Sequence, residues 1–159
     1  MIFVSTGSRK FQFNRLLQAL DGAIEAGIIQ DKVFAQIAES TYIPQRYEYK
    51  RYLSPEEFTR RQEEAFLIIS HAGTGALIGA LKKGKQVIAV PRLHRFGEHS
   101  DDHQTQISSA LAQEGYLREV LEIEKLGETI RLAYENPIVK KYDKPSKVVD
   151  IIDEFLSNL

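Results

Sequence analysis

Residues 66–75 read FLIISHAGTG, and this stretch decides the fold. Residues 66–70 are apolar on both faces, as in a strand buried inside a parallel sheet. His71 follows directly, and Gly73 and Gly75 then open a helical pattern. A buried strand that meets a glycine turn and then a helix predicts one repeating unit of an α/β fold.

The same order of elements extends in both directions along the chain. Residues 2–5 predict a first strand, which ends in a tight turn at Gly7 before a helical pattern. A further helix start is marked by Ser54, Pro55 and Glu57, which suit the N-cap, the first helical position and the capping glutamate. Other strands are expected at residues 33–38, 47–53, 86–90 and 116–120, and other helices after Gly73, near Asp102, and at residues 123–135 and 146–156. Strands and helices that alternate in this way predict a Rossmann-like parallel sheet with helices on both faces.

Length and composition set further expectations. The chain has 159 residues and shows no repeat or linker, so we expect one domain over residues 1–159. Its net charge of -1 provides no bulk attraction to nucleic acid. With no cysteine there is no disulfide framework, thiolate metal site or cysteine nucleophile, which is compatible with the cytoplasm. No signal peptide or apolar run of about 18 residues occurs, so no membrane span is expected.

The two glycine turns are candidate anion sites. Backbone amides and a helix N-terminus can hold a phosphate at such turns, which lie at the carboxyl ends of parallel strands. We therefore expect Gly7 on one turn, and Gly73 with Gly75 on the other, to face one diphosphate. The alternative for Gly7 is a tight connection with no ligand. His71 either donates to a phosphate or sugar hydroxyl or serves as a structural hydrogen-bonding group.

A polar loop after residue 91 collects the densest set of possible metal ligands. Its members are His94, Glu98, His99, Asp101, Asp102 and His103. This set would suit a metal hydrolase, but its spacing matches no common zinc pattern. We therefore expect no metal site.

A nicotinamide-dependent reductase is the competing enzyme class. Gly73, Gly75 and Gly79 form G-x-G-x-x-x-G, which overlaps the dinucleotide-binding pattern. That pattern is expected at the first strand, with an acidic residue about 20 positions later, whereas the next strand here leads to Arg92 instead. Tyr134 also has no lysine four residues later.

Two long segments carry a family resemblance. ISHAGTGALIGALKKGKQVIAVPR and the later GEHSDDHQTQISSALAQEGYL resemble the donor-binding C-terminal domain of glycosyltransferase family 28, which has the GT-B fold. With the MIFVSTGS opening, nearly the whole chain is similar to the small subunit of bacterial exopolysaccharide transferases. It is also similar to the corresponding subunit of the eukaryotic dolichol-linked N-acetylglucosamine transferase.

The resemblance implies a function and a partner. In these enzymes the donor-binding domain and the membrane-associated acceptor-binding domain are separate polypeptides. The chain would then bind a UDP-sugar, use no cofactor or metal, and transfer the sugar with inversion to a lipid-linked acceptor held by the partner. It would lie in the cytoplasm, at the inner face of the membrane through that partner. A polysaccharide or a lipid-linked oligosaccharide would be the product.

The resemblance also implies site residues. The diphosphate would meet two groups, Thr6, Gly7 and Ser8, and His71, Gly73, Thr74 and Gly75. Gln104 would reach the donor sugar, and Tyr52 and Leu53 would pack against uracil. The general base has no secure assignment: His99 and Asp101 are candidates, and the alternative is a base on the partner.

One position departs from the family. Relatives carry a glutamate for the ribose hydroxyls where this chain has Gly79. Two interpretations follow: an active donor-binding subunit with another ribose contact, or a helper that only stabilises its transferase partner. The apolar stripe of residues 146–156 would dock on that partner, or pack on its own sheet.

Overall fold

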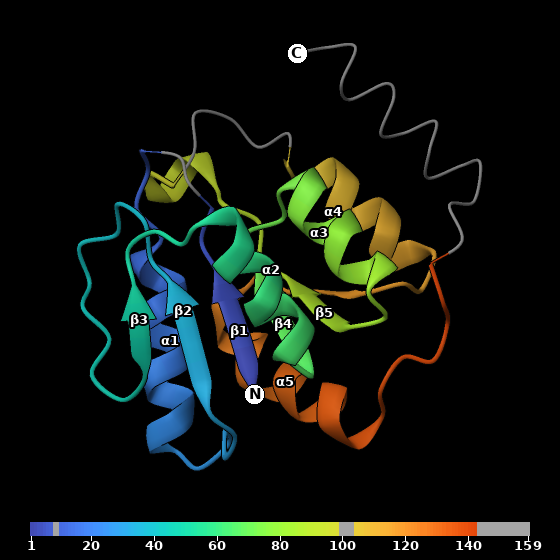
Figure 1. Ribbon diagram of the computed structural model, residues 1–159, viewed down its shortest axis with the longest axis horizontal. Coiled ribbons are helices and arrows are strands. Elements are labelled where there is room, and N and C mark those ends of the chain that lie inside the picture. The colour runs from blue at the N-terminus through green and yellow to red at the C-terminus, as the bar shows by residue number, and fades with distance from the viewer. Residues whose placement is uncertain (8–9, 99–103, 143–159) are drawn as a thin grey trace.

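Within the residues that the structure describes, six parallel strands form one sheet in the order β3-β2-β1-β4-β5-β6 (Figure 1). The structure is a computed structural model, and it describes residues 1–7, 10–98 and 104–142. The strands are β1 (Ile2–Ser5), β2 (Val33–Gln36), β3 (Glu48–Lys50), β4 (Leu67–Ser70), β5 (Gln86–Ala89) and β6 (Arg118–Glu119). The helices are α1 (Asn14–Glu25), α2 (Pro55–Glu64), α3 (Thr74–Lys82), α4 (Gln104–Gln113) and α5 (Leu126–Glu135), with 3-10 turns η1 (His94–Phe96) and η2 (Ile123–Lys125).

The strand order reverses direction between β1 and β4. The chain begins in the middle of the sheet, moves outward through β2 to β3, and returns to place β4 on the other side of β1. Ser5 and Ser70 are register partners, so both strands end at the same level. Ligands of open α/β sheets collect at such a switch point, outside the carboxyl ends of the strands.

Alternate side chains of each strand enter two separate cores. On β1, Ile2 and Val4 pack with α1 and α5 on one face, whereas Phe3 packs with α3 and α4 on the other. Figure 1 shows α1 and α2 on opposite sides of the sheet. Because strands buried on both faces carry apolar residues at every position, the continuous apolar run of β4 follows from this layering. The predicted Rossmann-like fold is therefore confirmed.

The start of α2 has the predicted cap. The Ser54 side chain accepts a hydrogen bond from the Glu57 amide at 3.1 Å, and Pro55 occupies the first helical position. Glu56 and Glu57 also place negative charge at the positive end of the helix.

Removing this cap should lower stability. We expect Ser54→Ala to reduce the free energy of unfolding by about 1 kcal/mol, because a first-turn amide loses its acceptor. Urea denaturation measures the change. Ser54→Asp is the control, since it retains a capping oxygen and should stay close to wild type; equal losses in both variants would contradict the assignment.

Several predicted strands are longer in the sequence pattern than in the structure. β2 ends at Gln36, two residues before the predicted end at residue 38. Ala38 then adopts a left-handed φ of 49°, which turns the chain away from the sheet. β3 and β6 are the edge strands and have one neighbour each, so pairing covers only three and two of their residues.

The first turn was predicted wrongly as a tight strand-to-helix connection. α1 begins at Asn14, well beyond Gly7, so that glycine does not lie at the N-terminus of the helix. The helix predicted at residues 146–156 lies outside the described residues. Among the helices that are described, none is long and apolar enough to cross a membrane.

Candidate functional site

Hydrogen bonds to Thr6 hold the first glycine turn in place. Thr6 is fully buried, and its hydroxyl donates to the Gln36 carbonyl at 3.0 Å. Arg92, also fully buried and just beyond β5, donates from Nη2 to the Thr6 carbonyl. Gly7 then turns the chain with a φ of 82°, which L side chains rarely adopt. The backbone of this turn is therefore held by neighbours on both sides of β1.

The second glycine turn leads directly into a helix. Ala72, which is buried, has a left-handed φ of 69°, and strained backbone of this kind is concentrated at functional sites. Gly73 is the N-cap of α3 and provides no side-chain cap, and the first turn carries no acidic residue. The first amides of α3 and the positive end of its dipole are thus available for an anion.

The imidazole of His71 lies against both turns. A Cβ atom at Gly7 would lie 2.8 Å from His71 Nε2, and one at Gly73 would lie 2.4 Å from the same atom. Both separations are too short for real contacts, so both positions require glycine while His71 holds this position. The structure therefore brings together three of the predicted site residues around a single side chain.

A cleft of about 470 Å³ opens from this point between α2 and α3. This volume lies within the range of small-molecule sites. Four predicted residues line it, namely Gly7, Leu53, His71 and Gly75. Gly79, the position that the sequence singled out for the ribose, also lines it. The sequence did not point to the rest of the lining as site residues, which comprises Ser5, Gln36, Pro55, Phe58, Thr59, Gln62 and Ala76.

Gln36 connects the first glycine turn with the segment that precedes α2. Its Nε2 donates to the Gly7 carbonyl at 3.4 Å, and its Oε1 accepts from the Leu53 amide at 3.2 Å. The Leu53 amide is therefore engaged within the protein, and the side chain of Leu53 remains the part that lines the cleft. Gln36 is the last residue of β2, next to the switch point, and a polar residue at the end of a predicted strand was the sequence signal that could have identified it.

The remaining predicted residues lie around this cleft or outside the described chain. Thr74 is the first residue of α3. Tyr52 is 49% exposed, and a hydrogen bond with Glu39 raises its pKa. Gln104 is the first residue of α4, and its side chain is not described. Ser8, His99 and Asp101 lie outside the described residues.

The loop that suggested a metal site contains a buried ion pair instead. Glu98 is fully buried and receives two hydrogen bonds of 3.0 Å from Arg15, one from Nε and one from an Nη atom. It also accepts from the Leu93 amide at 3.0 Å. Across residues 1–7, 10–98 and 104–142, no three potential metal ligands gather. Asp102 and His103 lie outside these ranges, so the expectation of no metal stays a prediction.

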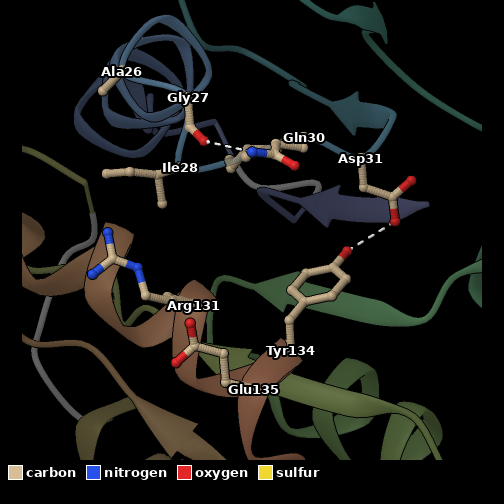
Figure 2. A pocket seen from close by; sticks show the side chains of 9 residues that line it. Ala26, Gly27, Ile28, Gln30, Asp31, Arg131, Tyr134 and Glu135 are labelled. Carbon is tan, nitrogen blue, oxygen red and sulfur yellow. Dashed lines mark hydrogen bonds between the residues drawn. The ribbon is translucent and has the colours of Figure 1, made fainter.

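A second cavity of about 590 Å³ lies beside the segment that precedes β2, and the glycine turns are not part of its lining (Figure 2). It lies beyond the C-terminus of α1, and its lining includes Arg131, Tyr134 and Glu135 of α5. The Tyr134 hydroxyl donates to Asp31 at 2.9 Å. Burial raises the pKa of Tyr134, and this hydrogen bond raises it further. Since helix C-termini and carboxylates disfavour anions, the cleft at the glycine turns is the better candidate for a phosphate ligand.

A family model matches residues 1–155, and its description is the glycosyltransferase family 28 C-terminal domain. The chain belongs to glycosyltransferase family 28. It matches the C-terminal domain of that family and has the Rossmann-like fold of the GT-B C-terminal half, as the sequence predicted. This membership favours a glycosyltransferase over the nicotinamide-dependent reductase. No curated protein matched the chain in sequence.

Solved glycosyltransferases share this fold at low sequence identity. The glycotransferase of kitacinnamycin aligns with a TM-score of 0.60 and 14% identity over 99% of this chain. The calicheamicin glycosyltransferase CalG4 aligns with a TM-score of 0.59 and 19% identity over 98% of this chain. MurG of Acinetobacter baumannii aligns with a TM-score of 0.55 and 19% identity over 96% of this chain. The chain covers 38% of each of the first two structures and 49% of MurG.

Proposed function

We propose that this chain is the UDP-sugar-binding subunit of a two-subunit inverting glycosyltransferase that makes a polysaccharide or a lipid-linked oligosaccharide. One observation carries the proposal: both glycine turns contact His71 at the β1–β4 switch point, where a cleft of about 470 Å³ begins. Family membership supports the reaction class.

The diphosphate of the donor would bind at the two glycine turns. The first amides of α3 would donate to one phosphate, and the helix dipole would favour its negative charge. These groups supply charge stabilisation of the kind that a metal gives in other transferases. An acceptor hydroxyl would then attack the anomeric carbon from the face opposite to UDP, and a general base would take its proton.

The acceptor would be held by a separate, membrane-associated partner. Support for this part comes from the resemblance of the MIFVSTGS opening and the DDHQ segment to small donor-binding subunits. We propose that the chain lies on the cytoplasmic side of the membrane through that partner.

Ligand binding distinguishes the possible functions. We expect UDP to raise the melting temperature of the purified chain and NADPH to leave it unchanged, because a ligand that binds only the native state stabilises that state. Stabilisation by NADPH alone would favour a reductase. A failure of UDP to bind would favour the helper interpretation. In that case the missing side chain at Gly79 would account for the lost ribose contact.

Activity should depend on the partner. We expect the purified chain alone to transfer little or no sugar from radiolabelled UDP-sugars to a lipid-linked acceptor. The same chain should become active after co-expression with membrane-associated acceptor-binding subunits from its source cell, followed by co-purification. Equal transfer rates by the chain alone and by every reconstituted pair would show that it is self-sufficient.

Gln104 should act on the sugar rather than on the nucleotide. We expect Gln104→Ala to keep its affinity for UDP and to lose turnover with the UDP-sugar. The loss should correspond to about 1 to 3 kcal/mol, as for a buried hydrogen bond. Calorimetry with UDP and an assay of the reconstituted pair measure the two effects, and equal turnover in the mutant and the wild type would refute the assignment.

A further inference from the structure

The buried face of α2 carries a polar side chain, Gln62, one turn beyond Phe58. Gln62 is 4% exposed, and it lines the cleft between α2 and α3. Among the residues that the structure describes, none forms a hydrogen bond with its carboxamide. The carboxamide is not one of the polar atoms that are closed off from water, so it faces the open space of the cleft, where it can bond to water or to a ligand.

The wall of the cleft formed by α3 carries only small residues, Gly75, Ala76 and Gly79. Gly75 and Gly79 of α3 line the cleft, and a Cβ atom at either position would meet nothing within 4 Å. Packing therefore does not require glycine at these positions, although glycine inside a helix is less stable than alanine. The two glycines instead keep open the space that Gln62 lines.

The lining also differs along the cleft. Gly7 and His71 lie at the end where the glycine turns meet, whereas Gln62 belongs to the wall formed by α2. Leu53 and Phe58 add apolar surface to that wall. A ligand whose phosphates bind at the turns would thus extend a less charged, partly apolar portion along α2.

We propose that Gln62 is a specificity-determining contact for the nucleoside portion of a nucleoside diphosphate. Its carboxamide both donates and accepts, which suits ribose hydroxyls or the imide edge of a pyrimidine base. This inference rests on the proposed function, since it takes the diphosphate to lie at the glycine turns.

Substitution by methionine tests the contact. Gln62→Met keeps the length of the side chain and removes the amide. We expect calorimetry to show UDP binding at least tenfold weaker and inorganic pyrophosphate binding unchanged, because pyrophosphate uses only the turns. The melting temperature without ligand should be nearly unchanged, because the carboxamide bonds to none of the described residues. Gln18→Met is the matched control, an exposed glutamine of α1 on the other side of the sheet, and it should leave UDP binding unchanged.

Three outcomes would overturn the proposal. Equal UDP affinity in Gln62→Met and wild type would remove Gln62 from the site and leave the proposed function intact. Parallel losses of UDP binding, pyrophosphate binding and melting temperature would assign Gln62 a structural role. If the wild-type chain binds neither UDP nor pyrophosphate, the proposed function fails and this inference fails with it.

Discussion

Gly73→Val will abolish measurable UDP binding in a chain that still folds. A Cβ atom at this position would lie 2.4 Å from His71 Nε2, so the imidazole must leave its place between the two turns. The φ of Gly73 is -69°, which any residue adopts, so the effect is steric and not one of backbone strain. The branched side chain would also lie beside the first amides of α3 and keep a phosphate away from them. We expect at least a hundredfold loss of affinity, about 2.7 kcal/mol, by calorimetry.

A double-mutant cycle separates the two causes. In a His71→Ala background the collision is absent, so any loss of UDP affinity that Gly73→Val still causes there comes from the side chain beside the first amides of α3, and the non-additive part measures the collision. Gly22→Ala is the control for folding, because its Cβ atom would meet nothing within 4 Å and it lies on α1, away from the cleft. Unchanged UDP affinity in folded Gly73→Val would remove this turn from the donor site.

Glu98→Ala will lower the free energy of unfolding by about 3 to 5 kcal/mol, because it leaves the Arg15 guanidinium partly buried without its counter-charge. The Arg15 side chain is only 13% exposed, and its other hydrogen bond is to the Pro91 carbonyl at 3.3 Å. The change also removes the acceptor of the Leu93 amide. Urea denaturation measures the loss.

The paired substitution Arg15→Met with Glu98→Leu is the control. Replacing both charges by apolar side chains leaves no charge uncompensated, so most of the lost stability should return. A loss below about 1 kcal/mol in Glu98→Ala would mean that the pair behaves like an exposed surface ion pair.

The strands and the family of folds were predictable because they depend on local pattern. β4 is apolar at nearly every position since both its faces are covered, and the cap at Ser54 is formed within four residues of chain. The start of α1 was not predictable in the same way. The Phe13 amide, just before that helix, donates to the Ser40 hydroxyl at 2.9 Å, and Phe13 is fully buried. A contact across 27 residues therefore holds the residue just before the helix, and local pattern does not show it.

The residues of the candidate site also fall into two groups, those that local sequence pattern predicted and those that it did not. Gly7, His71 and Gly73 were visible because glycine turns after buried strands carry their own signal. Gln36 and Gln62 acquire their roles only when β2 and α2 are placed beside the cleft, so the sequence pattern did not indicate them. For Gln62, the partial signal was a glutamine four residues after Phe58, on the helix face that packs inward.

The position of His71 between two glycines has a consequence for how related sequences diverge. Because one imidazole lies against Gly7 and Gly73 at once, a larger residue at either glycine displaces that imidazole unless residue 71 is itself smaller. Gly7 is constrained further by its φ of 82°, so Gly73 is the position with more freedom. Across homologues, we expect residues 71 and 73 to be replaced together, with small side chains at 71 wherever 73 is not glycine.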